Sequence, residues 1–228
     1  MRWKLYLLII LVLVSGVYYY RLNANTIYSR EEVFSIRAID GDTLELDNSL
    51  RIRLLGINTP EKNMPYYEEA KQFLQKLENK TIQIENNGPD KYDRILAYVY
   101  FNNNLINQEI LKNGFANLYY YGTDEHYEDM KKAEQFARDN ELGIWKKSEN
   151  KDCLKLIKFK TDEPENLILY NNCDKQLNII IKDDATHIYK ESINQNSLFE
   201  KNFSHIWNTE GDTLYIWDEK GLIIFKRY

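Results

Sequence analysis

Four short stretches of the chain contain residue types that together could cleave a phosphodiester bond. Such cleavage needs a cation on the phosphate, positive charge that stabilises the transition state, and a carboxylate that handles the proton of the attacking water. Candidates for all three lie in residues 40–43 (Asp-Gly-Asp-Thr), 51–56 (Arg-Ile-Arg-Leu-Leu-Gly), 58–61 (Asn-Thr-Pro-Glu) and 90–94 (Asp-Lys-Tyr-Asp-Arg). Their order and spacing predict a phosphodiesterase site.

The tripeptide Gly-Asp-Thr at 41–43 does not identify such a site alone, because it is also a common hairpin turn. It recurs at 211–213 without evident catalytic neighbours. The first copy differs because Arg53, Asn58 and Glu61 follow it in order. Each residue alone also has a purely structural interpretation: Arg53 could pair with Glu45 or Glu61, Arg94 with Asp93, Asp42 could close the turn, and Tyr92 and Tyr120 could pack in the core.

Hydrophobic patterning predicts the elements that must position these residues. Alternating apolar residues indicate strands and helical periodicity indicates helices, which places strands at 33–39, 44–46, 51–57, 81–84 and 95–101 and helices at 66–77, 105–113 and 125–140. In the meander formed by the first three strands, Asp42 and Asn58 fall at the same end. Five strands with helices after the third and fifth predict a five-stranded OB-fold barrel with three helices, of the α+β class.

From about residue 151 onward the sequence predicts short strands only. They fall at 154–159, 167–170, 177–181, 187–190, 203–206, 213–217 and 222–225. Strands at this spacing, separated by Asn, Asp and Gly turns, predict a small antiparallel β-sandwich of the all-β class. The predicted organisation is an N-terminal segment over 1–24, a barrel domain over 25–149 and a sandwich domain over 150–228.

Composition and charge narrow the function classes. The 228 residues are 43% hydrophobic and 29% charged, which is too apolar for intrinsic disorder. The net charge of −5 divides into +3 over 1–24, −6 over 25–149 and −2 over 150–228. This excludes binding of nucleic acid through bulk positive charge, although an acidic enzyme can act on nucleic acid when a few arginines converge on one groove.

The first twenty residues form a separate segment. Arg2 and Lys4 precede an apolar run over 5–14, and tyrosines occupy 18–20. The pattern is typical of an export signal or a membrane anchor, and the sequence leaves both open. Either alternative predicts an extracytoplasmic protein, secreted or held at the membrane by this segment. Cys153 and Cys173 could then form a disulfide, which is favoured here over two buried thiols.

The residue types in the four stretches also indicate which metal the site would take. The three histidines, His126, His187 and His205, lie outside the stretches. Their positions argue against a histidine-dependent nuclease and against a tetrahedral zinc site. The converging oxygen-rich side chains instead suit a hard cation such as Ca²⁺.

The region over 33–145 resembles the staphylococcal nuclease (thermonuclease, micrococcal nuclease) family, because the four stretches occur in that family's order. The resemblance implies an OB-fold, Ca²⁺-dependent endonuclease that cuts DNA and RNA with little sequence preference and leaves 3′-phosphate ends. It implies three groups of site residues: metal ligands Asp42, Asn58 and Thr59; catalytic residues Arg53, Glu61 and Arg94; and substrate-binding residues Lys91, Tyr92 and Tyr120.

Two positions depart from the family's pattern. Asn58 stands where well-studied members have aspartate, so one negative charge is missing and weaker Ca²⁺ binding is expected. Asp93 stands where the family often has glycine; it tolerates a left-handed turn and could hold Arg94 in the free enzyme.

The last third of the chain has a resemblance of its own. Residues 206–216 (Ile-Trp-Asn-Thr-Glu-Gly-Asp-Thr-Leu-Tyr-Ile) look like the closing strands of a lamin-tail domain, an immunoglobulin-like sandwich. This implies a module that binds or anchors an unknown ligand. Two other functions remain open: a non-catalytic OB-fold module that binds single-stranded nucleic acid, and an envelope adhesion protein whose sandwich is the main functional part. A monomer is expected.

Overall fold

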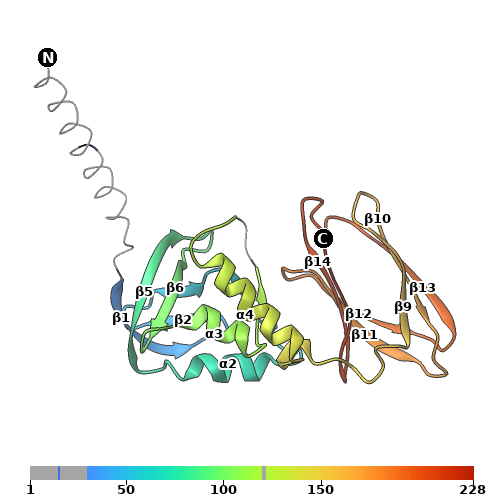
Figure 1. The fold of residues 1–228 in the computed structure, drawn as a ribbon, viewed down its shortest axis with the longest axis horizontal. Coiled ribbons are helices and arrows are strands. Elements are labelled where there is room, and N and C mark those ends of the chain that lie inside the picture. Colours follow the sequence, from blue (N-terminus) through green and yellow to red (C-terminus); the bar gives the residue numbers. More distant parts are fainter. Residues whose placement is uncertain (1–14, 16–29, 120–121) are drawn as a thin grey trace, which may run out of the picture.

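A computed structural model describes Ser15 and residues 30–119 and 122–228 (Figure 1). The remainder of the predicted signal or anchor segment, and Tyr120, lie outside the described residues. Within the described part of the chain, no helix is both long enough and apolar enough to cross a membrane.

The first half of the described chain forms a closed barrel. The strands run in the order β3-β2-β1-β5-β6-β7, and parallel pairing of β3 with β6 closes the sheet on itself. The main strands are β1 (Glu31–Ala38), β2 (Thr43–Leu46), β3 (Arg51–Leu54), β5 (Lys80–Pro89) and β6 (Ile95–Phe101). The helices are α2 (Tyr67–Gln75), α3 (Ile106–Lys112) and α4 (Tyr127–Asp139). The predicted five-stranded barrel with three helices is confirmed.

Short elements complete this half and alter one predicted strand. They are β4 (Ile57–Asn58), β7 (Asn104–Leu105), β8 (Asn117–Leu118) and the 3₁₀ helix η1 (Gly143–Trp145). The strand predicted over 51–57 ends at Leu54, because the chain turns at Gly56 with φ of 77°. The turn sends Asn58 to pair with Asn117 of β8 rather than along the barrel wall. Asn58 is therefore placed by a contact that strand periodicity does not reveal.

The barrel core follows from the alternation of apolar residues in the strands. Leu44, Ile52, Leu54, Ile82 and Val99 are all less than 2% exposed and belong to one cluster. Burying such side chains is the main favourable term in folding, at about 25 cal/mol per Å² of apolar surface. The core thereby holds the ends of β2 and β3, from which the predicted site residues project.

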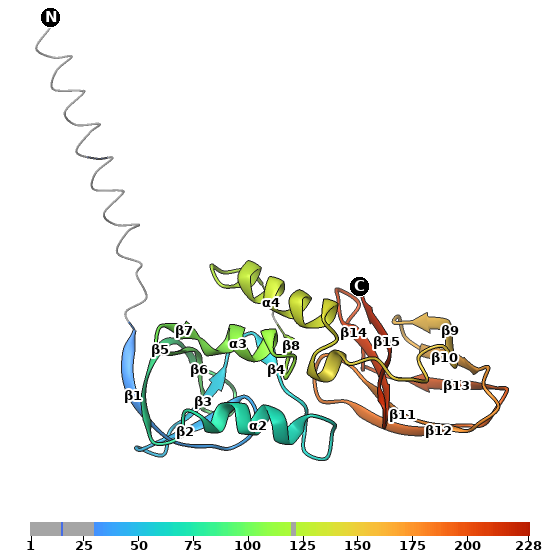
Figure 2. The same cartoon turned by 60° about the horizontal axis from the view of Figure 1, so that its bottom comes forward.

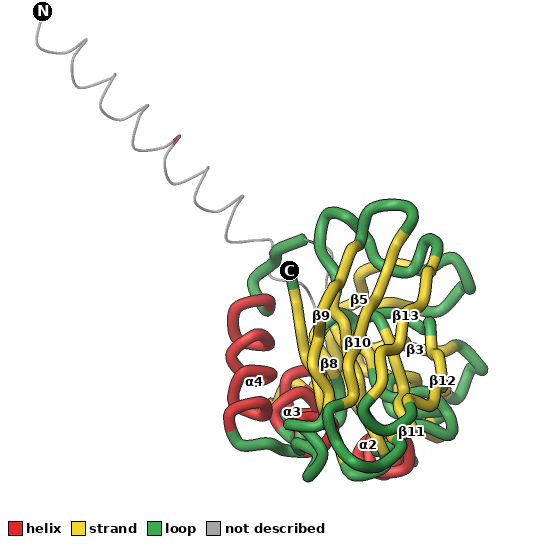
Figure 3. Tube along the Cα trace, turned by 90° about the vertical axis from the view of Figure 1, so that its right-hand side faces the viewer, coloured by secondary structure: helices red, strands yellow, loops and turns green. Residues whose placement is uncertain are grey.

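The second half forms two antiparallel sheets. One has the order β13-β10-β9 and the other β12-β11-β14-β15. The strands are β9 (Leu154–Lys160), β10 (Glu165–Asn171), β11 (Leu177–Lys182), β12 (Ile188–Ile193), β13 (Ser197–Phe203), β14 (Thr213–Asp218) and β15 (Gly221–Arg227). Figure 3 shows strands of both sheets running alongside one another. A shared apolar cluster joins the sheets, so the predicted β-sandwich is confirmed, and a disulfide joins Cys153 to Cys173.

One predicted strand of the sandwich is wrong. Residues 203–206 were expected to be extended, whereas the strand is β13 and the chain then bends at His205 with φ of 57°. The buried carboxylate of Glu165 accepts hydrogen bonds from the backbone N–H groups of Ile206 at 3.1 Å and Trp207 at 2.8 Å. A distant side chain therefore replaces the strand partner in this segment.

The barrel and the sandwich lie against each other, with α4 next to β14 and β15 (Figure 2). Arg227 of β15 donates two hydrogen bonds, at 2.6 and 3.0 Å, to Glu134 of α4, whose side chain is 1% exposed. The indole of Trp217 donates to the carbonyl of Ile144 at 3.0 Å, and Trp145 packs with Tyr215 in the same cluster. Because these groups are desolvated, the sandwich is held against the barrel rather than loosely tethered.

Candidate active site

Asp42 lies in the turn between β1 and β2 and is 6% exposed. Its Oδ2 atom accepts hydrogen bonds from the backbone N–H of Thr59 at 3.1 Å and from the Thr59 hydroxyl at 2.9 Å. Gly41 permits this approach, since a Cβ atom there would lie 2.8 Å from Thr59 Oγ1 and 2.7 Å from the Cβ of Ala70. The first Gly-Asp-Thr copy is therefore a turn packed against the loop that carries two further predicted ligands.

Arg53 connects the predicted ligands to the barrel. Its Nη2 atom lies 3.2 Å from Asp42 Oδ2 and donates to Asn58 Oδ1 at 3.1 Å. Its Nη1 atom donates to the carbonyls of Leu54 at 2.7 Å and Ile57 at 2.9 Å. With only 13% of the side chain exposed, the guanidinium is held rigidly beside Asp42. The structural alternatives for Arg53 do not hold, because Glu45 pairs with Arg37 and no ion pair joins Arg53 to Glu61 among the described residues.

Arg94 stands at the neighbouring strand. It directly precedes β6, which pairs in parallel with β3 through Ile52 and Ile95. Asp90 holds the guanidinium through bonds of 2.8 Å to Nε and 2.7 Å to Nη2. Asp93 adopts the expected left-handed turn, with φ of 60°, but Asp90 rather than Asp93 is the partner of Arg94. The side chain is 28% exposed, so the arginine is oriented and still accessible.

Asp40 lies beside the predicted ligand Asp42, whose backbone N–H donates to Asp40 Oδ1 at 3.0 Å, and was not among the residues predicted from the sequence. Burial, and then the negative charge of Asp42, raise the pKa of Asp40 from 3.8 to about 6. The signal was present in the sequence as two carboxylates two residues apart. Arg53 already pairs with Asp42 at 3.2 Å, and a bound cation would further reduce the repulsion between the two carboxylates.

The donor atoms of this site fit a hard cation. They are carboxylate oxygen from Asp42 and amide oxygen from Asn58, with Asp40 adjacent, and the family resemblance implies the backbone carbonyl oxygen of Thr59 as a third. Ca²⁺ prefers oxygen ligands of these kinds. Thr59 and Asn58 are 4% and 6% exposed, so their positions are defined by packing.

The other predicted residues that the structure describes, Glu61, Lys91 and Tyr92, are partly or fully exposed to solvent. Glu61 is partly exposed and lies within electrostatic reach of Lys182 and Tyr67. Tyr92 is 65% exposed, so it is not part of the barrel core. The ammonium of Lys91 lies 5.0 Å and the guanidinium of Arg94 5.4 Å from the centre of its ring. Exposed aromatic and cationic groups of this kind can stack on a base and attract a phosphate.

The sandwich reaches the site, which the sequence did not indicate. The amide of Asn58 donates to the carbonyl of Asp184 at 3.0 Å and to the carbonyl of Ala185 at 3.1 Å. Asn117 also donates to Asp184 Oδ1, at 3.3 Å. A cavity of about 520 Å³ opens nearby between the two halves, lined by Tyr119 and Gly122 on one side and by Arg227 on the other.

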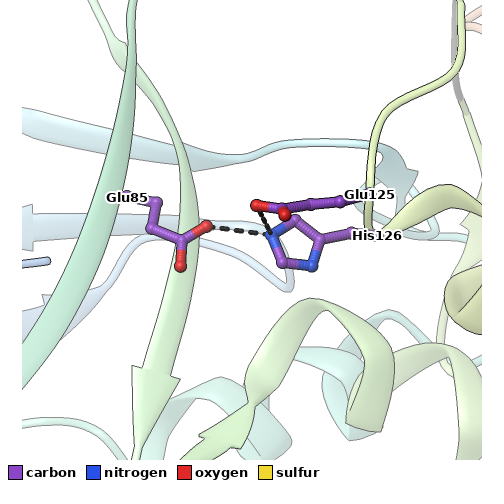
Figure 4. Close-up of side chains that lie close together, drawn as sticks. All are labelled: Glu85, Glu125 and His126. Atoms are coloured by element: carbon purple, nitrogen blue, oxygen red, sulfur yellow. Dashed lines mark hydrogen bonds and ion pairs between the residues drawn. The ribbon is translucent and has the colours of Figure 1, made fainter. Parts of the chain in front are cut away.

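A second cluster of possible metal ligands lies elsewhere on the barrel (Figure 4). Ligand atoms of Glu85, Glu125 and His126 lie within 4.8 Å of one another. Glu85 already pairs with Arg30 at 3.1 Å and with His126 at 2.9 Å, and Arg30 covers the Tyr100 ring at 3.5 Å. Because the arginine supplies the positive charge, we interpret this cluster as an ion-pair network that stabilises the fold.

Replacing Glu85 by glutamine is expected to lower the free energy of unfolding by about 1 kcal/mol at pH 7, after allowance for solvent screening. Burial alone would raise the pKa of Glu85, but hydrogen bonds from His126, Tyr100 and Arg30 lower it below 4.5. A lowered carboxylate pKa stabilises the folded state above the unfolded pKa, and the effect is lost as the pH falls through the folded value.

Urea unfolding at pH 7 and below pH 4 measures this difference. The deficit of the Glu85→Gln protein should shrink at the lower pH. Glu125→Gln is the matched control, since Glu125 is 65% exposed and lies 3.8 Å from the same histidine. A deficit that is the same at both pH values would contradict the assignment.

Comparisons with known proteins agree with the arrangement of this half. Residues 51–147 match the sequence model of the family described as staphylococcal nuclease homologue. The chain is 33% identical over 124 residues to a thermonuclease of Staphylococcus intermedius, covering 49% of this chain and 74% of that protein. It is 37% identical over 149 residues to an uncharacterized protein of Methanocaldococcus jannaschii, covering 50% of this chain and 72% of the relative. An SPbeta prophage-derived endonuclease of Bacillus subtilis is 37% identical over 127 residues, which are 49% of this chain and 43% of the relative.

Proposed function

Because the chain belongs to the staphylococcal nuclease family, we propose that it is a Ca²⁺-dependent endonuclease that hydrolyses phosphodiester bonds of DNA and RNA. Cleavage would show little sequence preference and leave 3′-phosphate ends. The observation that carries the proposal is that Asp42 and Asn58 both contact the guanidinium of Arg53, while Thr59 donates to Asp42. That group of residues combines the oxygen ligands and the fixed positive charge that phosphodiester cleavage needs.

Each residue has a role that its surroundings support. Asp42, Asn58 and Thr59 would hold Ca²⁺, which supplies positive charge to the phosphate when bound. Arg53 and Arg94 would bind the scissile phosphate, because a planar guanidinium matches two phosphate oxygens. Glu61 would orient or deprotonate the attacking water. The remaining proposed contacts, from Lys91, Tyr92 and Tyr120, would line the nucleotide pocket.

The competing function is a module that binds single-stranded nucleic acid without cleaving it. Binding alone needs aromatic rings and positive charge. Binding alone needs no glutamate beside the phosphate, so the presence of Glu61 together with Asp42, Arg53 and Arg94 favours hydrolysis over simple binding.

We also propose an extracytoplasmic location. The disulfide between Cys153 and Cys173 supports it, since disulfides persist in oxidising compartments. The segment over 1–24 would be either removed on export or kept as a membrane anchor. The sandwich would serve as a lamin-tail-like binding or anchoring module on a monomeric enzyme.

Incubation of the purified chain with single-stranded DNA, in Ca²⁺ or in a chelator, tests the activity. We expect cleavage only with Ca²⁺, and strongly reduced cleavage by Glu61→Gln and Arg94→Ala proteins. Equal cleavage in every reaction would indicate contamination. Binding of the DNA with no cleavage under any condition would favour the non-catalytic module.

The Ca²⁺ affinity is expected to be weak, with a dissociation constant of ~10⁻⁴ to 10⁻³ M, because Asn58 contributes no charge to the ligand set. Isothermal titration calorimetry measures it. Asp42→Asn should abolish the binding heat and serves as the control. A sub-micromolar dissociation constant for the unmodified chain would contradict this prediction.

A further inference from the structure

The second Gly-Asp-Thr copy, at 211–213, forms hydrogen bonds with a residue outside its own turn. The backbone N–H of Asp184 donates to Asp212 Oδ1 at 3.0 Å, and Asp212 is 5% exposed. The hydroxyl of Thr213 donates to Asp184 Oδ2 at 2.7 Å. Both polar residues of the motif therefore hold Asp184, a residue of the loop between β11 and β12.

Other buried groups fix the rest of this loop, residues 183–187, which we term the β11–β12 loop. Lys182, only 4% exposed, donates from Nζ to the carbonyl of Asp183 at 2.9 Å and also to the carbonyl of Ala185. The backbone N–H of His187 donates to Asp183 Oδ1 at 3.1 Å. With each of these groups paired, the directions of the loop carbonyls are set within the sandwich itself.

Two of those carbonyls determine how Asn58 is oriented. The carbonyls of Asp184 and Ala185 can only accept hydrogen bonds, so the NH₂ group of the Asn58 amide must face them. The opposite oxygen, Oδ1, then points to Arg53, which donates to it at 3.1 Å. Only this orientation satisfies both sides of the amide, and it turns the oxygen toward the side on which Arg53 and Asp42 lie.

We propose that the β11–β12 loop is a positioning element for the metal site and that Lys182 is its central positioning residue. The inference rests on the proposed function, since it takes Asn58 as a Ca²⁺ ligand. It also explains why asparagine stands at this position. An aspartate would place carboxylate oxygens against the two carbonyls, where no hydrogen is available and like partial charges repel. The neutral amide of Asn58 can therefore contact the sandwich where a carboxylate could not.

Replacing Lys182 by methionine in the full chain tests the positioning. The substitution keeps an unbranched side chain of nearly the same length and removes its hydrogen-bond donors. We expect the Ca²⁺ dissociation constant, measured by calorimetry, to rise about tenfold, as for other groups that orient a metal ligand. Lys190→Met is the control, because Lys190 is exposed on the neighbouring strand β12. Thr213→Val is a second variant, which removes the hydroxyl that donates to Asp184 Oδ2 at 2.7 Å and accepts from Arg227 Nε at 2.9 Å.

A double-mutant cycle separates positioning from general stability. In the Asn58→Asp background the contact with the loop is already broken, so Lys182→Met should change the Ca²⁺ dissociation constant less than twofold. A role in stability alone would weaken Ca²⁺ binding equally in both backgrounds, and that result would overturn the proposal. Unchanged Ca²⁺ binding in both Lys182→Met and Thr213→Val would overturn it as well.

Hydrogen exchange in the presence of a chelator gives a readout that needs no metal. Asn58→Asp should speed the exchange of backbone amides over 183–187, whereas Lys190→Met should not. Unchanged exchange in Asn58→Asp would show that the Asn58 amide makes no lasting contact with the loop carbonyls and would overturn the proposal. If no protein of the series binds Ca²⁺, both the proposed function and the positioning role are wrong. If Ca²⁺ binds but its affinity does not depend on Lys182, only the positioning role is wrong.

Discussion

Replacing Arg94 by alanine is expected to lower kcat for DNA cleavage by about 10² to 10³, which is typical of losing one preorganised charge stabiliser. Asp90 holds the guanidinium through two of its nitrogens, while 28% of the side chain stays exposed to a ligand. The arginine is therefore oriented before a phosphate arrives. Because it is not part of the core, its removal should leave the fold intact.

The Arg94→Ala measurement combines initial cleavage rates with thermal unfolding. The melting temperature should stay close to that of the unmodified chain. Arg37→Ala is the matched control, since Arg37 is a 60% exposed arginine of the same barrel that also pairs with a carboxylate. A rate within threefold of the unmodified chain would show that Arg94 does not stabilise the transition state.

Replacing Arg53 by methionine is expected to reduce both activity and stability. The guanidinium pairs with Asp42 and donates hydrogen bonds to Asn58 and to two backbone carbonyls, and only 13% of the side chain is exposed. Removing it leaves the Asp42 charge unpaired beside Asp40, and breaking a buried pair in this way costs about 3–5 kcal/mol. Cleavage should fall by about 10² to 10³ as well.

Chemical unfolding with and without Ca²⁺ distinguishes the two effects of Arg53→Met. Added Ca²⁺ should recover part of the lost stability, because the cation replaces positive charge next to Asp42. Arg51→Met is the control, as Arg51 is an exposed arginine of the same strand. If Arg53→Met were as stable as the unmodified chain, the expected cost of leaving the Asp42 charge unpaired would be contradicted, whatever the activity of the variant.

Much of the fold was predictable because its signals are local. Strand alternation and helical periodicity follow from which side chains face the core, and both are visible over a few residues. The barrel strands and α2, with its buried Ala70 and Leu74, were found in this way. The strand at Ser197–Phe203 was missed because only alternate residues are partly buried and its polar positions include Glu200 and Lys201.

The site was predicted from local signals as well, but only from several residues taken together. Gly-Asp-Thr occurs twice, and the first copy became informative when Arg53, Asn58 and Glu61 followed it in order. The structure brings Asp42, Arg53 and Asn58 into hydrogen-bonding contact. The partner of Arg94 was not predictable, because Asp90 and Asp93 both lie within reach along the chain and only the turn geometry selects one.

The sequence alone determined the residue types of a phosphodiesterase site and the barrel that carries them, because both are encoded within short stretches. Only the tertiary structure decided what surrounds Asn58. Its partners Asp184 and Ala185 lie 126 and 127 residues further along the chain, and they contribute backbone carbonyls, which every residue has. Such a contact leaves no mark in residue type or spacing. It exists because the buried interface between barrel and sandwich brings the two segments together.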